Sequence, residues 1–179
     1  VGGISLSGPA VTVASGALLD LSGGGQLLGA GFISGRGGSV DVLLNPLAAA
    51  NPGNSYSNLK NQVFAIVPSA NPDYAPIVPA SQGAAPSIGQ RITVGGGVPG
   101  LAAGTYTLMP ASYALLPGAF RVELTPADSR GVVFATTALA NGSYLASARL
   151  GTVNTGISES LARRVIVTPG TVVRTHSLY

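Results

Sequence analysis

The apolar residues of this chain come in short runs that glycine, proline, serine or threonine interrupts every few positions. The 179 residues include 26 glycines and 13 prolines. The longest apolar stretches, residues 101–116 and 131–140, are interrupted in this way, and neither approaches the roughly 18 uninterrupted apolar residues that a membrane-spanning helix needs. The apolar residues are therefore assigned to β-strands, and the chain is predicted to be all-β without a membrane span.

Composition narrows the class of protein further. Only 8% of the residues are charged, against about 25% in an ordinary soluble domain. A mean hydropathy of +0.43 argues against disorder, which combines low hydrophobicity with high net charge. The net charge of +3 comes from nine scattered Lys and Arg residues with one adjacent pair, Arg163 and Arg164, so nucleic acid is not a predicted partner. The absence of cysteine excludes disulfides and thiolate metal sites.

The N-terminal part has the pattern of a solenoid. Residues 4–21 read ISLSGPAVTVASGALLDL, with brief alternating runs separated by Gly and Ser. Strands this short need neighbours stacked above and below them, as in the coils of a β-solenoid. The glycines of residues 23–38 lack the Lys-Ser or Lys-Thr pair and the following helix of a phosphate-binding loop, so they are interpreted as tight turns. Residues 1–44 are predicted to form β-helix coils.

The composition changes at residues 45–58, NPLAAANPGNSYSN, which are predicted to be a boundary loop. Beyond it, residues 45–179 are predicted to form a compact antiparallel domain of the β-sandwich or barrel-like type, with the last strands free to rejoin the β-helix. Residues 71–86 are predicted to be a long loop and residues 158–164 a short helix. The expected strands are Gln62–Val67, Arg91–Val94, Thr105–Met109, Phe120–Leu124, Val132–Thr137, Tyr144–Leu150, Val165–Thr168 and Val172–Thr175.

Templates for catalysis find no match in the sequence. A Ser/His/acid triad needs a histidine as base, and the sole candidate is His176, near the end of the chain. Glycoside hydrolysis needs a pair of carboxylates, but the acidic residues form no close motif. The same scarcity of His and clustered acids disfavours metal sites. We therefore expect no enzyme activity, no cofactor, no metal site and no catalytic residue. The acidic residues are Asp20, Asp41, Asp73, Glu123, Asp128 and Glu159.

Two further features have a structural interpretation. Asn141-Gly142-Ser143 is formally a glycosylation sequon, but Asn-Gly between two β runs first predicts a hairpin turn. Aromatic residues inside the expected strands and turns are predicted to pack the β domain. The sequence contains no tryptophan, which weakens the case for a sugar-stacking platform, and it specifies no binding residues. These aromatic residues are Tyr106, Tyr113, Phe120 and Tyr144.

Several segments resemble a region of the very large filamentous-haemagglutinin-like exoproteins of Gram-negative bacteria. The N-terminal segment GALLDLSGGG is followed by Phe32 and by GRGGSVD, and later segments include VPGL, GTYTLMP and YALLPGAFRV. The likeness covers nearly the whole chain in order. The matching residues are 16–25, 32, 35–41, 98–101, 104–110, 113–122, 154–157 and 172–175.

The resemblance implies secretion through a dedicated outer-membrane transporter of the two-partner type and a right-handed parallel β-helix. It also implies a place at the bacterial surface, in an adhesin, a biofilm-matrix protein or a stalk that carries a toxin. The start at Val1, without an initiator methionine or a signal sequence, is interpreted as a cut through a longer exoprotein. The implied partners are the rest of that exoprotein, the transporter, and host or matrix glycans or proteins. No catalytic residues carry over.

Three functions remain in competition on the sequence. The first is a non-enzymatic module for attachment, aggregation or matrix architecture. The second is a processing or hydrolytic domain, or the stalk of a toxin-carrying exoprotein. The third is a carbohydrate binder that uses Tyr and Arg side chains on one β face.

Overall fold

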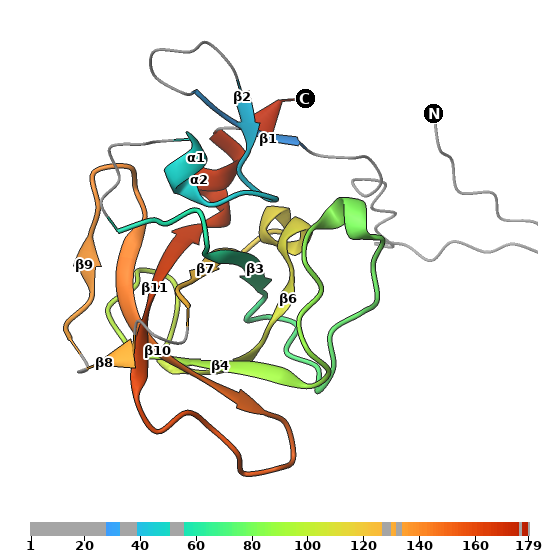
Figure 1. Cartoon of the computed structure of the whole chain (residues 1–179), viewed down its shortest axis with the longest axis vertical. Helices are drawn as coiled ribbons and strands as arrows, with labels where there is room; N and C mark the ends of the chain where they lie inside the picture. Colours follow the sequence, from blue (N-terminus) through green and yellow to red (C-terminus); the bar gives the residue numbers. More distant parts are fainter. Residues whose placement is uncertain are drawn as a thin grey trace, which may run out of the picture.

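The computed structural model describes residues 28–32, 39–50, 56–126, 130–131, 134–175 and 177–178. Over these residues the protein is mostly β, and its main body is an antiparallel, nearly closed barrel of seven strands (Figure 1). The prediction of an antiparallel, barrel-like β domain is thus confirmed. Two short helices and a small second sheet lie at the top of the barrel in the view of Figure 1.

The strands follow the order β5-β4-β10-β11-β7-β3-β6 around the barrel, and neighbours along the chain are often not neighbours in the sheet. Two short strands lie off this path, where β8 pairs with β11 and β9 pairs with β10. The bounds are β3 Gln62–Ile66, β4 Gln90–Val94, β5 Gly104–Thr107, β6 Met109–Pro110, β7 Phe120–Leu124, β8 Arg130–Gly131, β9 Thr137–Ala138, β10 Tyr144–Thr152 and β11 Ala162–Pro169.

One continuous segment, residues 104–110, brings the two ends of the strand order together. Its first half, β5, pairs with β4, and its second half, β6, pairs with β3. Only Leu108 separates the halves, and its backbone N–H donates a 3.0 Å hydrogen bond to the carbonyl of Gln90 on β4. Because β5 and β6 are the outermost strands of the order, this change of partner closes the barrel and leaves little free edge.

The barrel interior is apolar because alternate residues of each strand point inward. On β7, for example, Phe120, Val122 and Leu124 face the interior, whereas Arg121 and Glu123 face outward. Tyr106 and Tyr144 also pack inside, which confirms the structural role predicted for these aromatics. The interior residues are Phe64, Ile66, Ile92, Val94, Val98, Leu101, Tyr106, Leu108, Phe120, Val122, Leu124, Ala146, Ala148, Val165 and Val167, with Tyr144 and Leu150 packed against them.

A second apolar cluster covers the outer face of β3. There Val63, Ala65 and Val67 pack against a 3₁₀-helix, η2, at Ala111–Leu115 and against α2 at Gly170–Thr175. Residues 42 and 43, which follow β2, pack in the same cluster, while α1, Leu47–Ala50, lies within the predicted boundary loop. This side of the barrel therefore has a covering layer, and its outward residues are as buried as the interior ones.

The small sheet has the order β12-β1-β2, and both of its pairings are antiparallel. Its strands are β1 Leu28–Phe32, β2 Ser39–Asp41 and β12 Ser177–Leu178. Only six residues connect β1 to β2, which suits an antiparallel pair and is too short for the crossover that parallel strands need. The parallel β-helix predicted for residues 1–44 is therefore not found in the described part of that range. Residues 1–27 lie outside the described residues.

Three local predictions were wrong. The expected strand Val172–Thr175 is part of α2, and the expected helix at residues 158–164 gives way to β11, which pairs with both β10 and β7. Residues 134–136 of the expected strand 132–137 lie outside strands, between β8 and β9. Tertiary pairing and packing outweigh the weak local preferences of such short segments. The long loop at residues 71–86 is confirmed, with one 3₁₀ turn, η1, at Ala80–Gln82.

Candidate functional site

The acidic residues of the sequence analysis are candidates for chemistry, and the structure holds the described ones in contacts of the fold. The carboxylate of Asp41 accepts a 2.9 Å hydrogen bond from the backbone N–H of Leu43. Asp73 forms a 2.8 Å ion pair with Arg91 at the surface. Asp20, Asp128 and the single histidine, His176, lie outside the described residues.

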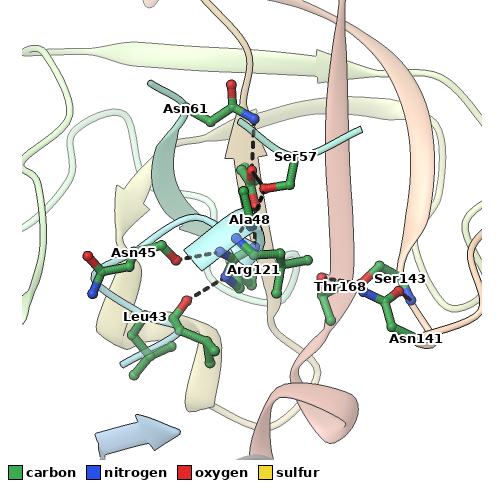
Figure 2. Close-up of polar contacts among 12 residues, drawn as sticks. Leu43, Asn45, Ala48, Ser57, Asn61, Arg121, Asn141, Ser143 and Thr168 are labelled. Carbon is green, nitrogen blue, oxygen red and sulfur yellow. Dashed lines mark hydrogen bonds and ion pairs between the residues drawn. The ribbon is translucent and has the colours of Figure 1, made fainter. Parts of the chain in front are cut away.

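Glu123 and Arg121 form an ion pair on the outer face of β7, beneath the segment that follows β2. The distance from Arg121 Nη1 to Glu123 Oε2 is 3.1 Å, and the two side chains are 1% and 0% exposed. Arg121 also donates hydrogen bonds to the carbonyls of Val42, at 2.7 Å, and Asn45, at 3.0 Å (Figure 2). The guanidinium therefore fastens residues 42–45 to the barrel wall.

The carboxylate of Glu123, the other member of the pair, also has several hydrogen-bond donors around it. Glu123 accepts hydrogen bonds from Asn61 Nδ2, at 2.8 Å, from the backbone N–H of Leu47, at 3.0 Å, and from the hydroxyl of Ser57. Burial lowers the pKa of Arg121 below its ordinary value, and the charge of Glu123 and its hydrogen bond act in the opposite direction. Both charges are thus committed to holding the covering layer in place.

Glu159 and Arg163 make a second, nearly buried pair at the end of the β10–β11 hairpin. Arg163 Nε donates a 2.9 Å hydrogen bond to Glu159 Oε2, and a second contact joins Nη2 to Oε1, so the pair is bidentate. Arg163 Nη1 also reaches the carbonyl of Thr125 at 2.8 Å, and Glu159 Oε2 accepts from the backbone N–H of Leu150. These contacts position the loop that joins β10 to β11.

The Asn141-Gly142 turn joins β9 to β10, as the sequence predicts. Gly142 has a φ of 81°, and its N–H donates to the carbonyl of Leu139. Ser143, the last residue of the formal sequon, is 1% exposed and shares a 2.8 Å hydrogen bond with Thr168 (Figure 2). The Ser143 hydroxyl is therefore engaged in a hydrogen bond in the protein interior.

The described residues form an open groove of about 350 Å³ on the outside of the barrel. We call it the outer groove. Its floor is the outer face of β4 and β10, and one wall is the segment 134–136 between β8 and β9. The lining residues are Thr93, Val94, Gly95, Gly96, Phe134, Ala135, Thr136, Ser147, Ala148, Arg149 and Ala162.

Strand register places the polar groups of the outer groove in rows. Thr93 of β4 pairs with Thr105 of β5 on one side and with Arg149 of β10 on the other. Two residues before Arg149 on β10, Ser147 pairs with Arg164 of β11. Since residues two apart on a strand share a face, Ser147 and Arg149 lie side by side on the floor.

The wall of the outer groove is fixed by close contacts. Thr136 donates a 2.7 Å hydrogen bond to the carbonyl of Gly96. Gly97 has a φ of 101°, and a Cβ at this position would lie 2.9 Å from the Cβ of Thr136, so glycine permits the approach. The Phe134 ring lines the groove, with the guanidinium of Arg164 5.8 Å from the ring centroid.

No local sequence pattern predicts the outer groove. Its residues come from three separate segments, and only the strand order brings them together. The triplet Gly95-Gly96-Gly97 after β4 is the one local signal of a close backbone approach at this place. The carbohydrate hypothesis put Tyr and Arg on one face, whereas the aromatic residue that lines the groove together with Arg149 is Phe134.

No protein-family model, curated protein or solved structure matches this chain. The likeness to exoproteins therefore rests on the sequence segments alone. Over the described residues, no helix is long and apolar enough to cross a membrane. No group of three or more metal-ligating side chains occurs in the same part of the chain.

Proposed function

We propose that this chain is a non-enzymatic attachment or architectural module of a secreted bacterial surface exoprotein. The observation that carries the proposal is the use of the four described carboxylates. Asp41, Asp73, Glu123 and Glu159 each bind a backbone N–H or an arginine of the same fold. General acid–base or nucleophilic chemistry needs such a group directed at a substrate site, whereas these groups stabilise loops and the covering layer.

Two further features support the proposal. The small sheet pairs β1 with β12, so the two segments that lead into and out of the barrel lie side by side (Figure 1). A module with adjacent connections is readily carried on a longer surface protein. The resemblance of the segments in the sequence analysis supplies the family context, including export through a two-partner transporter.

The test is an attachment assay with the full chain. Beads that carry the 179-residue chain are counted on bacterial biofilm and on host-cell layers, and bead–bead aggregation is measured in parallel. The control is beads that carry the same chain after irreversible heat denaturation. We expect retention or aggregation that depends on the folded chain. Equal retention and equal aggregation for folded and denatured chain would contradict the proposal.

A further inference from the structure

We infer that the outer groove binds an acidic saccharide, that is, a sugar ring that bears a carboxylate. This inference rests on the proposed function, because it names the ligand class of the attachment module. Three properties of the outer groove carry it: an uncommitted positive charge, one hydroxyl without a hydrogen-bond partner in a lining that includes an aromatic ring, and a floor without free backbone edges.

The charge of the outer groove is positive and available. The guanidinium of Arg149 is exposed and forms no hydrogen bond or ion pair with another described residue, in contrast to Arg91, Arg121 and Arg163. None of the lining residues is acidic. Since a guanidinium matches a carboxylate in charge and in planar geometry, the charge of this groove favours a carboxylate ligand.

The remaining lining favours a sugar among carboxylate ligands. Ser147 is 7% exposed, and its buried Oγ has no hydrogen-bond partner. A buried hydroxyl without a partner costs free energy, and a ligand hydroxyl at the groove floor would recover it once the Ser147 side chain rotates Oγ toward the groove. The Thr93 hydroxyl, which pairs with Thr105 at 2.8 Å, keeps further hydrogen-bonding capacity. Phe134 adds an apolar surface for the C–H face of a sugar ring, and the volume of about 350 Å³ is within the range of small-molecule sites.

An acidic peptide fits the outer groove less well. Extended peptides gain much of their affinity by pairing with the free edge of a sheet. The floor strands have no such edge here, because β4 pairs with both β5 and β10, and β10 pairs with both β4 and β11. The outer groove therefore offers side chains rather than a row of main-chain donors and acceptors.

The test is calorimetric titration of the full chain with two acidic probes, trigalacturonic acid and 3′-sialyllactose. Each probe has a neutral counterpart, the methyl ester of the same sugar, in which only the carboxylate charge is removed. We expect saturable binding of at least one acidic probe. We also expect binding of its neutral counterpart to be weaker by about tenfold or more, the effect of losing a hydrogen-bonded charge.

The variant Arg149→Gln removes the proposed carboxylate partner from an exposed strand position. We expect it to lower the affinity for the acidic probe about tenfold while Arg149→Lys retains part of the affinity. Lys60→Gln is the matched control, because it removes one exposed positive charge from a turn outside the outer groove and is expected to leave the affinity unchanged.

Three results would overturn the inference: no binding of either acidic probe, equal affinity of wild type and Arg149→Gln, or tighter binding of a pentaglutamate peptide than of both sugars. The bead assay separates this failure from that of the proposed function. Beads that attach although the chain binds no acidic sugar would refute the ligand class alone. Sugar binding without bead attachment would refute the attachment role and leave the ligand class standing.

Discussion

Arg121 and Glu123 lie two residues apart on β7 and form an ion pair, 3.1 Å between Nη1 and Oε2, on the outer face of the barrel. An outward strand face is normally where charges meet water. Here the backbone of Val42, Asn45 and Leu47 covers the pair, and hydrogen bonds from Ser57 and Asn61 complete the coordination of the carboxylate. The pair thus connects the barrel wall to the segment that follows β2 and to Ser57 and Asn61.

Removal of one member of this pair is expected to destabilise the fold strongly. Arg121→Met leaves the carboxylate of Glu123 buried without its opposite charge, and we expect a loss of about 3–5 kcal/mol in the free energy of unfolding. Urea denaturation at neutral pH measures this loss. The double variant Arg121→Met/Glu123→Leu is expected to cost less than the sum of the two single changes. Strict additivity of the single variants would show that the two groups do not interact.

Two further ion pairs of the described residues are expected to differ in strength because they differ in exposure. The Glu159 and Arg163 side chains are 12% and 8% exposed, whereas those of Asp73 and Arg91 are 57% and 23% exposed. Glu159→Gln is expected to cost about 2 kcal/mol or more, and Asp73→Asn less than about 1 kcal/mol. The same urea titration compares both variants. A larger loss for Asp73→Asn than for Glu159→Gln would contradict this assignment.

Gly170, at the start of α2, has no space for a side chain. A Cβ there would lie 2.4 Å from the carbonyl oxygen of Ala114 and 2.8 Å from that of Ala119, and backbone atoms cannot yield cheaply. We expect Gly170→Ala to lower the melting temperature and to cost roughly 2 kcal/mol or more by overpacking. Gly131→Ala is the control, because a Cβ at that position meets nothing within 4 Å. Equal effects of the two changes would refute the packing described for α2.

Closure of the barrel depends on Leu108, which is 0% exposed and lies between β5 and β6. Its amide hydrogen is expected to exchange slowly with solvent, because it bonds the carbonyl of Gln90 within the barrel. The amide of Ile77, in the exposed loop 71–86, is expected to exchange fast. Leu108→Ala is expected to cost about 2–5 kcal/mol, as for other large core truncations. Fast exchange at Leu108 would mean that the barrel is open there.

The sequence predicted where the strands of this fold lie better than which strands pair with each other. Five expected strands of the β domain reappear within a few residues of their predicted bounds, because alternation and flanking turn residues act locally. The segment around Leu108 shows that local patterns do not specify which strands pair. The expected strand 105–109 is one extended segment, and nothing in it indicates that its halves pair with β4 and β3, which lie on opposite sides of it.

The site was less predictable than the fold. Arg121 and Glu123 alternate with apolar residues in Phe120–Leu124, which indicates an outward face but not the layer that buries it. The outer groove depends on Phe134, Ser147 and Arg149 meeting through strand order. Its recognition therefore required the register of β10 against β4 and β11.

The claim that the outer face of β4 and β10 is the binding surface is tested most directly by chemical-shift mapping. The isotopically labelled full chain is titrated with trigalacturonic acid, and backbone amide shifts are followed residue by residue. We expect the largest shifts in residues 93–96, 134–136 and 147–149, around the groove. Shifts centred on the covered face at η2 and α2, or no shifts at saturating sugar, would contradict it.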